Sequence, residues 1–95
     1  MKIKVYATLR QIVGDKSLDF PVNNPVTMGE VLSQVIQLYP GLRSELFYQN
    51  GELLDRVHIL INGRDVRFFD RKLETYVSSE DTISIFPAVG GGSFC

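Results

Sequence analysis

The sequence has very little cysteine and no strong excess of charge of either sign. Cys95 is its one cysteine and His58 its one histidine, among 95 residues. A single thiol cannot close an intrachain disulfide, and without a cluster of thiols and imidazoles the chain lacks the usual ligands of a zinc site. Lys and Arg number 10 against 11 Asp and Glu, a net charge of −1. Because phosphate backbones attract basic surfaces, this balance argues against a nucleic-acid partner.

Long apolar runs are also missing. No stretch of the sequence approaches the roughly 20 apolar residues that are needed to span a bilayer. Residues 1–6 alternate polar and apolar side chains, unlike the continuous apolar segment of a signal peptide. We therefore expect a cytoplasmic protein with no membrane partner. With 44% hydrophobic and 22% charged residues, the chain has the composition of one globular domain.

The first half of the chain predicts two strands and a helix. Alternating apolar residues favour one strand over residues 2–9 and a second over residues 17–22. Thr27 and Glu30 have the spacing of a capping box, in which two residues satisfy each other's free amides at a helix start. A helical stripe of apolar residues follows until Pro40-Gly41, where proline ends the helix.

The second half predicts a hairpin and a final strand. Residues 57–62 alternate as a strand, and Asn62-Gly63 favours the positive backbone angles of a tight hairpin turn. The partner strand is expected at 66–68 and the last strand at 82–86, with a short helix near residues 42–47 before them. The fold class is therefore α+β: a mixed sheet of four to five strands packed on one main helix. With the first and last strands as central neighbours, this arrangement is the ubiquitin-like β-grasp fold.

The end of the chain is rich in glycine. Pro87 follows the last predicted strand, and Gly90, Gly91 and Gly92 come shortly after it. Glycine has no Cβ, so successive glycines form a thin thread that can enter a narrow enzyme channel. Proline has a fixed φ angle and stiffens the exit from the sheet. We therefore divide the chain into a domain over residues 1–89 and a flexible tail over residues 90–95.

Two segments resemble the MoaD/ThiS family of ubiquitin-like sulfur carriers. Residues 85–92, Ile-Phe-Pro-Ala-Val-Gly-Gly-Gly, are similar to the Phe-Pro-Pro-Val-Ala-Gly-Gly terminus of MoaD, the small subunit of molybdopterin synthase. Residues 57–68 resemble the family's hairpin of strand, Asn-Gly-Arg turn and strand. The helix exit at residues 39–42 and the opening strand with Leu9-Arg10 are also similar, so the resemblance covers essentially the whole chain.

The resemblance implies a carrier rather than an enzyme. It implies that a ubiquitin-activating-like adenylyltransferase uses ATP to adenylate the terminal glycine, and that a sulfur donor converts it to a thiocarboxylate. Gly91 and Gly92 then form the functional pair, and Gly92 carries the sulfur. The implied acceptor is a molybdopterin precursor, for molybdenum or tungsten cofactor, on the large subunit of molybdopterin synthase. A thiazole precursor or another acceptor stays open, and no permanently bound cofactor is implied.

The sequence departs from the family after Gly92, where Ser93-Phe94-Cys95 follows. The carbonyl of Gly92 is therefore part of a peptide bond and cannot be adenylated. We predict that a processing protease cuts after Gly92; the alternative is that these residues stay and the protein carries no sulfur. No positive charge lies near Cys95 in the sequence to activate its thiol, which favours an inert or removed cysteine.

Apolar residues that point away from the core predict a docking surface. Leu60 and Phe86, with Tyr6 and Phe68, project from predicted strands whose alternate positions fill the core, and a cluster of four such residues near the tail would mark an interface. If they are exposed singly, they are ordinary surface. In the family, this sheet face and the tail together engage the activating enzyme and the large synthase subunit. The predicted partner-binding residues are Phe86, Pro87, Val89, Leu60, Phe68 and Gly90.

Two other functions stay open at this point. The same end joined to lysines of target proteins would make the chain a protein modifier, and a β-grasp domain without an activated end would be a binding module. A stand-alone enzyme is disfavoured, because the sequence offers no nucleophile–base pair and no phosphate loop. His58 has no acid or nucleophile close to it in sequence, which favours a surface or structural role over catalysis.

Overall fold

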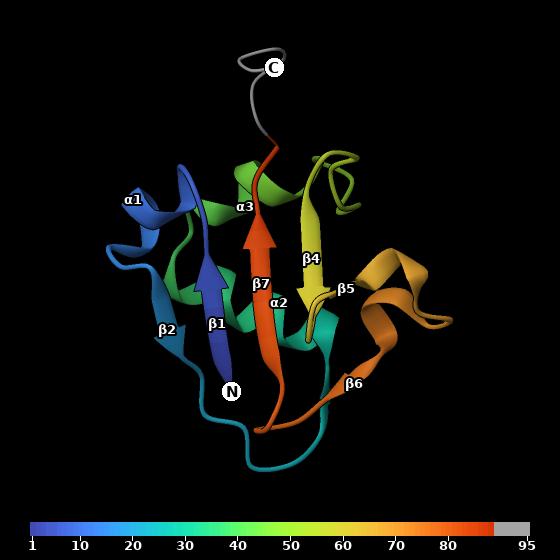
Figure 1. Cartoon of the computed structure of the whole chain (residues 1–95). Helices are drawn as coiled ribbons and strands as arrows, with labels where there is room; N and C mark the ends of the chain where they lie inside the picture. Colours follow the sequence, from blue (N-terminus) through green and yellow to red (C-terminus); the bar gives the residue numbers. More distant parts are fainter. Residues whose placement is uncertain (89–95) are drawn as a thin grey trace.

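The computed structural model describes residues 1–88, which form a two-layer domain. Five strands make one mixed sheet in the order β2-β1-β7-β4-β5, with α2 and α3 behind it (Figure 1). The strands are β1 Lys2–Val5, β2 Ser17–Asp19, β4 His58–Ile61, β5 Arg64–Asp65 and β7 Thr82–Phe86. The predicted β-grasp arrangement is confirmed, because β1 and β7 are parallel neighbours in the middle of the sheet.

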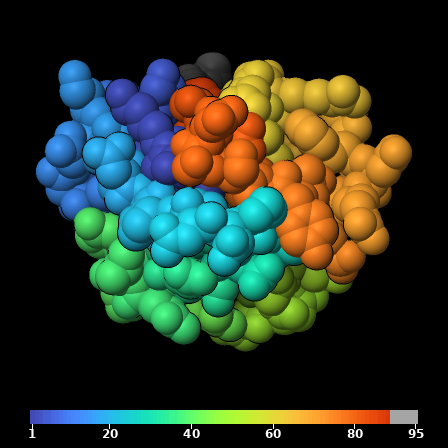
Figure 2. All heavy atoms as spheres, turned by 90° about the horizontal axis from the view of Figure 1, so that it is seen from below, coloured from blue at the N-terminus to red at the C-terminus, as the bar shows by residue number. Residues whose placement is uncertain are grey.

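Shorter elements complete the domain around this sheet. They are α1 Leu9–Val13, α2 Met28–Leu38, α3 Leu42–Leu46, the 3-10 turns η1 Val66–Phe68 and η2 Lys72–Glu74, and the strands β3 Val26–Thr27 and β6 Tyr76–Val77. β3 and β6 pair with each other in a separate antiparallel sheet. In the view from below, β3 and β6 lie at the end of the molecule that is remote from the exit of β7 (Figure 2).

The centre of the core lies on the inner face of β7. Its inward residues, Ile83 and Ile85, are fully buried. They lie opposite buried apolar residues on both neighbouring strands, namely Ile3 and Val5 on β1 and Ile59 and Ile61 on β4. Burying each such side chain contributes about 1.5–3 kcal/mol. The alternation predicted for these three strands is therefore confirmed where they meet.

Helix α2 begins where the sequence predicts it. The backbone N–H of Glu30 donates to Oγ1 of Thr27 over 3.1 Å, and the N–H of Thr27 donates to Oε1 of Glu30 over 3.1 Å. This is the complete capping box. The helix then buries one stripe against the sheet, made of Met28, Val31, Leu32 and Val35. The short helix expected near residues 42–47 is also present, as α3.

The strand predicted over residues 2–9 is too long. It ends at Val5, because Ala7 adopts a positive φ of 56° and turns the chain into α1. Leu9 is buried as expected, but from the helix and not from the strand. The spacing of Leu9, Ile12 and Val13 is helical, and that pattern could have indicated α1. The second strand is also shorter than predicted, since β2 ends at Asp19.

The hairpin after β4 has the predicted turn but not the predicted second strand. Asn62 and Gly63 have φ angles of 52° and 89°, the positive values that the Asn-Gly pair favours. The strand expected at 66–68 is wrong, because those residues form the 3-10 turn η1 and β5 comes earlier. The physical reason is a cap: a carboxylate oxygen of Asp65 accepts the N–H of Arg67 over 2.8 Å.

Asp65 joins three parts of the domain through polar contacts. Its second carboxylate oxygen lies 2.8 Å from Nδ1 of His58, and the Arg67 guanidinium donates to the carbonyl oxygens of Leu54 and Val57. Burial by itself would raise the pKa of Asp65. The Arg67 N–H, the His58 ring and the Arg67 charge outweigh burial and lower that pKa from 3.8. His58 thus has the structural role that the sequence favoured.

We expect Thr27→Ala to lower the free energy of unfolding by about 1 kcal/mol, because the first turn of α2 loses its side-chain cap. Urea unfolding followed by circular dichroism measures this change. Thr27→Ser keeps the accepting oxygen and is the matched control. Equal stability of the alanine and serine variants would contradict a contribution from the capping box.

We expect Asp65→Asn to destabilise the fold by about 1 kcal/mol near neutral pH, because the His58 and Arg67 contacts lose a charged partner. The folded pKa of Asp65 lies below its unfolded value, so the carboxylate stabilises the fold above about pH 4. This contribution is lost as the pH falls through the folded pKa. Urea unfolding from pH 7 down to about pH 3 should show the two proteins converge. The exposed Asp70→Asn variant is the control, and a pH-independent difference would sink the idea.

Candidate functional site

The predicted working end begins where β7 leaves the sheet. Phe86 ends the strand, Pro87 is buried, and Ala88 packs partly against the core. Pro87 is therefore anchored to the domain, so that the chain leaves β7 from a fixed point. The predicted residues Val89, Gly90, Gly91 and Gly92 lie outside the described residues.

A stacked aromatic pair lies beside this exit, on the outer face of the sheet. The rings of Tyr6 and Phe86 have centroids 4.2 Å apart and an interplanar angle of 9°. The N–H of Tyr6 donates to the carbonyl oxygen of Ile85 over 3.2 Å, which extends the pairing of β1 and β7 by one residue. Such ring pairs add about 0.5–1.5 kcal/mol to the burial of their area. The pair therefore links the first strand to the residue just before Pro87.

Arg10 extends this pair toward β2. Its Nε donates to the carbonyl oxygen of Val5 over 3.0 Å, and its guanidinium carbon lies 5.3 Å from the centroid of the Tyr6 ring. A guanidinium over an aromatic ring is a favourable cation–π contact. The sequence did not predict Arg10 as a site residue. The short helix α1 brings it back over Tyr6, so predicting that helix would have indicated its position.

Leu60 lies on the same outer face, on the other side of β7. In the antiparallel pairing of β4 and β7, Leu60 is opposite Ser84 and His58 is opposite Phe86. Opposite residues of a sheet share a face, so both side chains of β4 point the same way as Phe86. Leu60 is half-buried, and the His58 side chain is 56% exposed. Tyr6, Phe86 and Leu60 therefore lie on one face of the sheet, which we call the outer sheet face.

Phe68 does not belong to the outer sheet face. It lies in η1, after the edge strand β5, and is 71% exposed. The prediction that it projects from a strand is wrong, because the Asp65 cap turns residues 66–68 into a 3-10 helix. A large exposed aromatic side chain still offers a contact for another protein. Its place in the fold separates that contact from the exit of β7.

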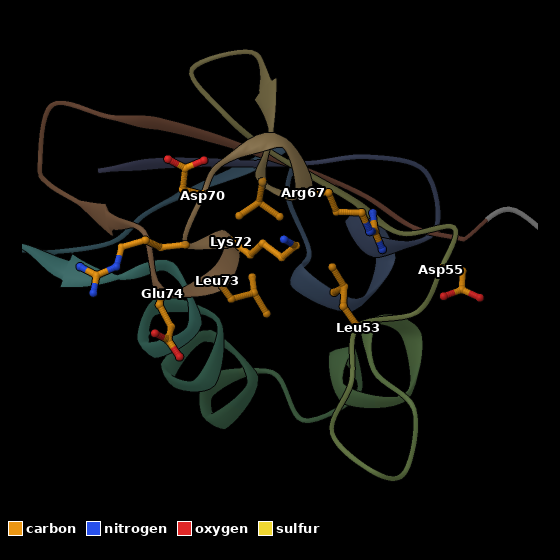
Figure 3. Close-up of a pocket in the computed structure, with 9 residues that line it drawn as sticks. Leu53, Asp55, Arg67, Asp70, Lys72, Leu73 and Glu74 are labelled. Carbon is orange, nitrogen blue, oxygen red and sulfur yellow. The ribbon is translucent and has the colours of Figure 1, made fainter.

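A separate hollow, drawn in Figure 3, shares no lining residue with the outer sheet face. It has a volume of about 670 Å³ and is lined by Leu53, Asp55, Val66, Arg67, Asp70, Arg71, Lys72, Leu73 and Glu74. Leu53 and Leu73 point toward each other across it, and charged side chains of both signs surround them (Figure 3). Three cations and three carboxylates line it, so it has no net preference for an anion or a cation.

Other kinds of site receive no support from the part of the chain that the structure describes. Residues 1–88 contain no group of three or more His, Cys, Asp or Glu side chains arranged to hold a metal ion. No helix among these residues is both long enough and apolar enough to cross a membrane. Within residues 1–88, the candidate site is the outer sheet face together with the exit of β7.

Two of the curated proteins that resemble this chain in sequence show how far the similarity extends. Small archaeal modifier protein 3 of Haloferax volcanii is 36% identical over 92 residues, which cover 97% of this chain and 98% of the relative. Sulfur carrier protein CysO of Mycobacterium tuberculosis is 37% identical over 68 residues, which cover 70% of this chain and 72% of the relative. The first alignment spans nearly the whole domain.

A solved structure has the same fold. It is a chain in the crystal structure of the Amycolatopsis orientalis BexX/CysO complex, with a TM-score of 0.76 and 29% identity over 96% of this chain and 98% of that one. The ThiS family matches residues 3–92, from the first strand through the last glycine of the run. The chain therefore belongs to the ThiS family of ubiquitin-like sulfur carriers.

Proposed function

We propose that this protein carries sulfur on Gly92 after a protease has removed the residues that follow. The observation that carries the proposal is the family match, which runs through residue 92 and ends before Ser93. The fold supports it, because β7 is the last described strand before the glycine run and is paired on both sides. A strand held in this way gives the reactive end a rigid base.

The chemistry explains why such a carrier needs partners. A carboxylate is a poor acyl donor, so an adenylyltransferase first joins it to the AMP part of ATP and releases pyrophosphate. Sulfide then attacks the Gly92 carbonyl carbon and displaces AMP, which leaves a thiocarboxylate. The sulfur bonds to the acceptor, and water then hydrolyses the bond between the Gly92 carbonyl carbon and that sulfur, which leaves the sulfur on the acceptor and restores the carboxylate. In this proposal ATP and the catalytic side chains belong to the partners, while this chain supplies the end group and a docking surface.

The glycine run suits the proposed activation. Gly90, Gly91 and Gly92 have no side chains, so an enzyme channel that admits only a backbone can take them. Ser93 blocks the reaction as long as the Gly92–Ser93 peptide bond is intact. Cleavage of that bond by a processing protease is therefore the step that makes the carrier competent.

The sulfur acceptor is proposed from the resemblance to MoaD. The Phe-Pro-Ala-Val ending and the Asn-Gly-Arg hairpin favour a molybdopterin precursor bound to a large synthase subunit. The name of the relative CysO supports the broader statement, a sulfur carrier, and leaves the acceptor to experiment. Transfer of sulfur from the thiocarboxylated protein to the pterin precursor, with the large subunit present, tests this narrower proposal.

A second function has its own support. The relative with 36% identity is named a modifier protein. A modifier would use the same activated Gly92 to form an isopeptide bond with a lysine of a target protein. Digestion of target proteins would then leave a Gly-Gly remnant on the modified lysine. The two functions share their first step, so one protein can perform both.

The outer sheet face is the proposed docking surface for the adenylyltransferase and the large subunit. Tyr6 and Phe86 are stacked and half-buried, and they lie beside the exit of β7. Leu60 lies on the same face, opposite Ser84 of β7. The related structure is a chain of the BexX/CysO complex, which supports a protein partner for this chain as well.

We expect a chain that ends at Gly92 to gain sulfur when it is incubated with the host's activating enzyme, ATP and sulfide. Intact mass spectrometry measures the exchange of one oxygen for one sulfur. The full-length chain should show no exchange, because its Gly92 carbonyl is in a peptide bond. A chain that ends at Gly91 is the matched control, because it has a free carboxylate but lacks Gly92.

Intact masses of the protein from its native host test the cleavage itself. Mature protein ending at Gly92 supports the proposal. Only full-length protein in cells that make the sulfur-containing product would exclude processing as the route.

We expect Leu60→Asp and Phe86→Asp to abolish detectable binding to the activating enzyme, because each buries a charge in an apolar contact. Isothermal titration calorimetry measures the affinity, and circular dichroism checks the fold. Leu38→Asp is the matched control, since Leu38 is an exposed apolar residue of α2, in the other layer. Wild-type affinity in both outer-face variants would contradict the proposed surface.

A further inference from the structure

A shallow hollow next to the outer sheet face carries positive charge alone. It has a volume of about 210 Å³ and is lined by Lys2, Lys4, Tyr6, Arg10, Lys16 and Ser17. Lys2 and Lys4 alternate along β1 with buried residues, so they point to the same side of the sheet as Tyr6. Four of the ten Lys and Arg residues of the chain thus line one small hollow.

Among residues 1–88, the nearby carboxylates form no salt bridge with these cations. Asp19 is the cross-strand neighbour of Lys2, and an oxygen of Asp15 accepts the backbone N–H of Lys16 over 2.6 Å. Within residues 1–88, no carboxylate oxygen lies within 4.0 Å of a side-chain nitrogen of these lysines or of Arg10. A concentration of like charge on a chain with a net charge of −1 is a local feature that a partner can recognise.

The hollow is continuous with the apolar pair. Arg10 belongs to both, because it lines the hollow and lies over the ring of Tyr6. Its hydrogen bond to the carbonyl oxygen of Val5 fixes it in that position. A surface that covers Tyr6 and Phe86 therefore also meets the edge of the hollow.

We propose that the hollow receives an acidic segment of the protein that docks on the outer sheet face. The inference rests on the proposed function, since it describes the activating partner. That partner carries clustered Asp or Glu side chains beside the apolar group that covers Tyr6 and Phe86. These carboxylates bind to Lys2, Lys4 and Lys16, which already lie together in the hollow. This complementarity of charge speeds the encounter of the two proteins and fixes the orientation of the complex.

A protein partner fits better than a nucleic acid. Bases bind basic surfaces by stacking on open aromatic rings. Phe86 stacks on the Tyr6 ring and the Arg10 guanidinium lies 5.3 Å from its centroid, so the ring already makes these contacts within the protein and is less open to stacking by a base. The 670 Å³ hollow near η2 gives no comparable inference, because its six charged lining residues cancel.

The test compares two triple variants with the same change in charge. Lys2→Glu/Lys4→Glu/Lys16→Glu removes the charge of the hollow, and Arg43→Glu/Arg56→Glu/Arg71→Glu alters exposed residues elsewhere. The probe is the purified activating enzyme of the same organism, titrated by calorimetry without ATP or sulfide. We expect the lysine variant to bind at least about tenfold more weakly, and the arginine variant to bind within about twofold of wild type. The Lys→Gln triple variant should lie between wild type and Lys→Glu, and thermal unfolding checks that each variant is folded.

Salt gives an independent reading of the same contact. The wild-type Kd should rise from about 50 to 500 mM salt, and the lysine variant should respond less, because screening acts on exposed charge pairs. A salt-independent wild-type Kd, equal losses in both triple variants, or no binding of wild type would each overturn the proposal. So would a single-stranded RNA that binds wild type and not the lysine variant. Because no chemistry is needed for binding, failure of Gly92 to acquire sulfur leaves this result readable.

Discussion

β7 lies between β1, its parallel neighbour, and β4, its antiparallel neighbour, and this double pairing sets both faces of the sheet. Ile83 and Ile85 fill the core on one face. The period of two then sends Ser84 and Phe86 to the other face, where Phe86 meets Tyr6. A shift of one residue in either pairing would exchange the two faces. The core and the proposed docking surface are therefore two results of one register.

Polar contacts stabilise a part of the domain that lies outside the pairing of β7, the turn η1 and the chain before β4. Asp65 caps η1 and holds His58, while Arg67 ties η1 to the backbone of residues 54 and 57. These contacts lie on the far side of β4 from the basic hollow. The outer sheet face is thus bordered on one side by the His58–Asp65–Arg67 group and on the other by cations that form no salt bridge within residues 1–88. Such an asymmetric frame favours one orientation of a bound partner over its reverse.

The sequence predicts the fold where apolar periodicity is long and the capping residues are explicit. β4, β7 and α2 are found in this way, and so is the central position of β7. Elements of two or three residues, such as β3 and β6, are too short to show a period. Positions decided by a single backbone angle or cap were also missed, as at Ala7 and Asp65. For the site, the sequence indicates Tyr6, Leu60 and Phe86, but Arg10 and the lysine hollow need the paired register and the turn into α1.

The parallel pairing also governs when this protein becomes usable. Lys2 pairs with Thr82 and Val5 with Ile85, so the centre of the sheet joins the first described strand to the last one described. Contacts so distant in sequence form late in folding. A nascent chain that lacks β7 has neither a closed core nor the Tyr6–Phe86 pair. Pairing of β7 therefore closes the domain and creates the proposed docking surface in one step, and a chain without β7 offers an activating enzyme no such surface.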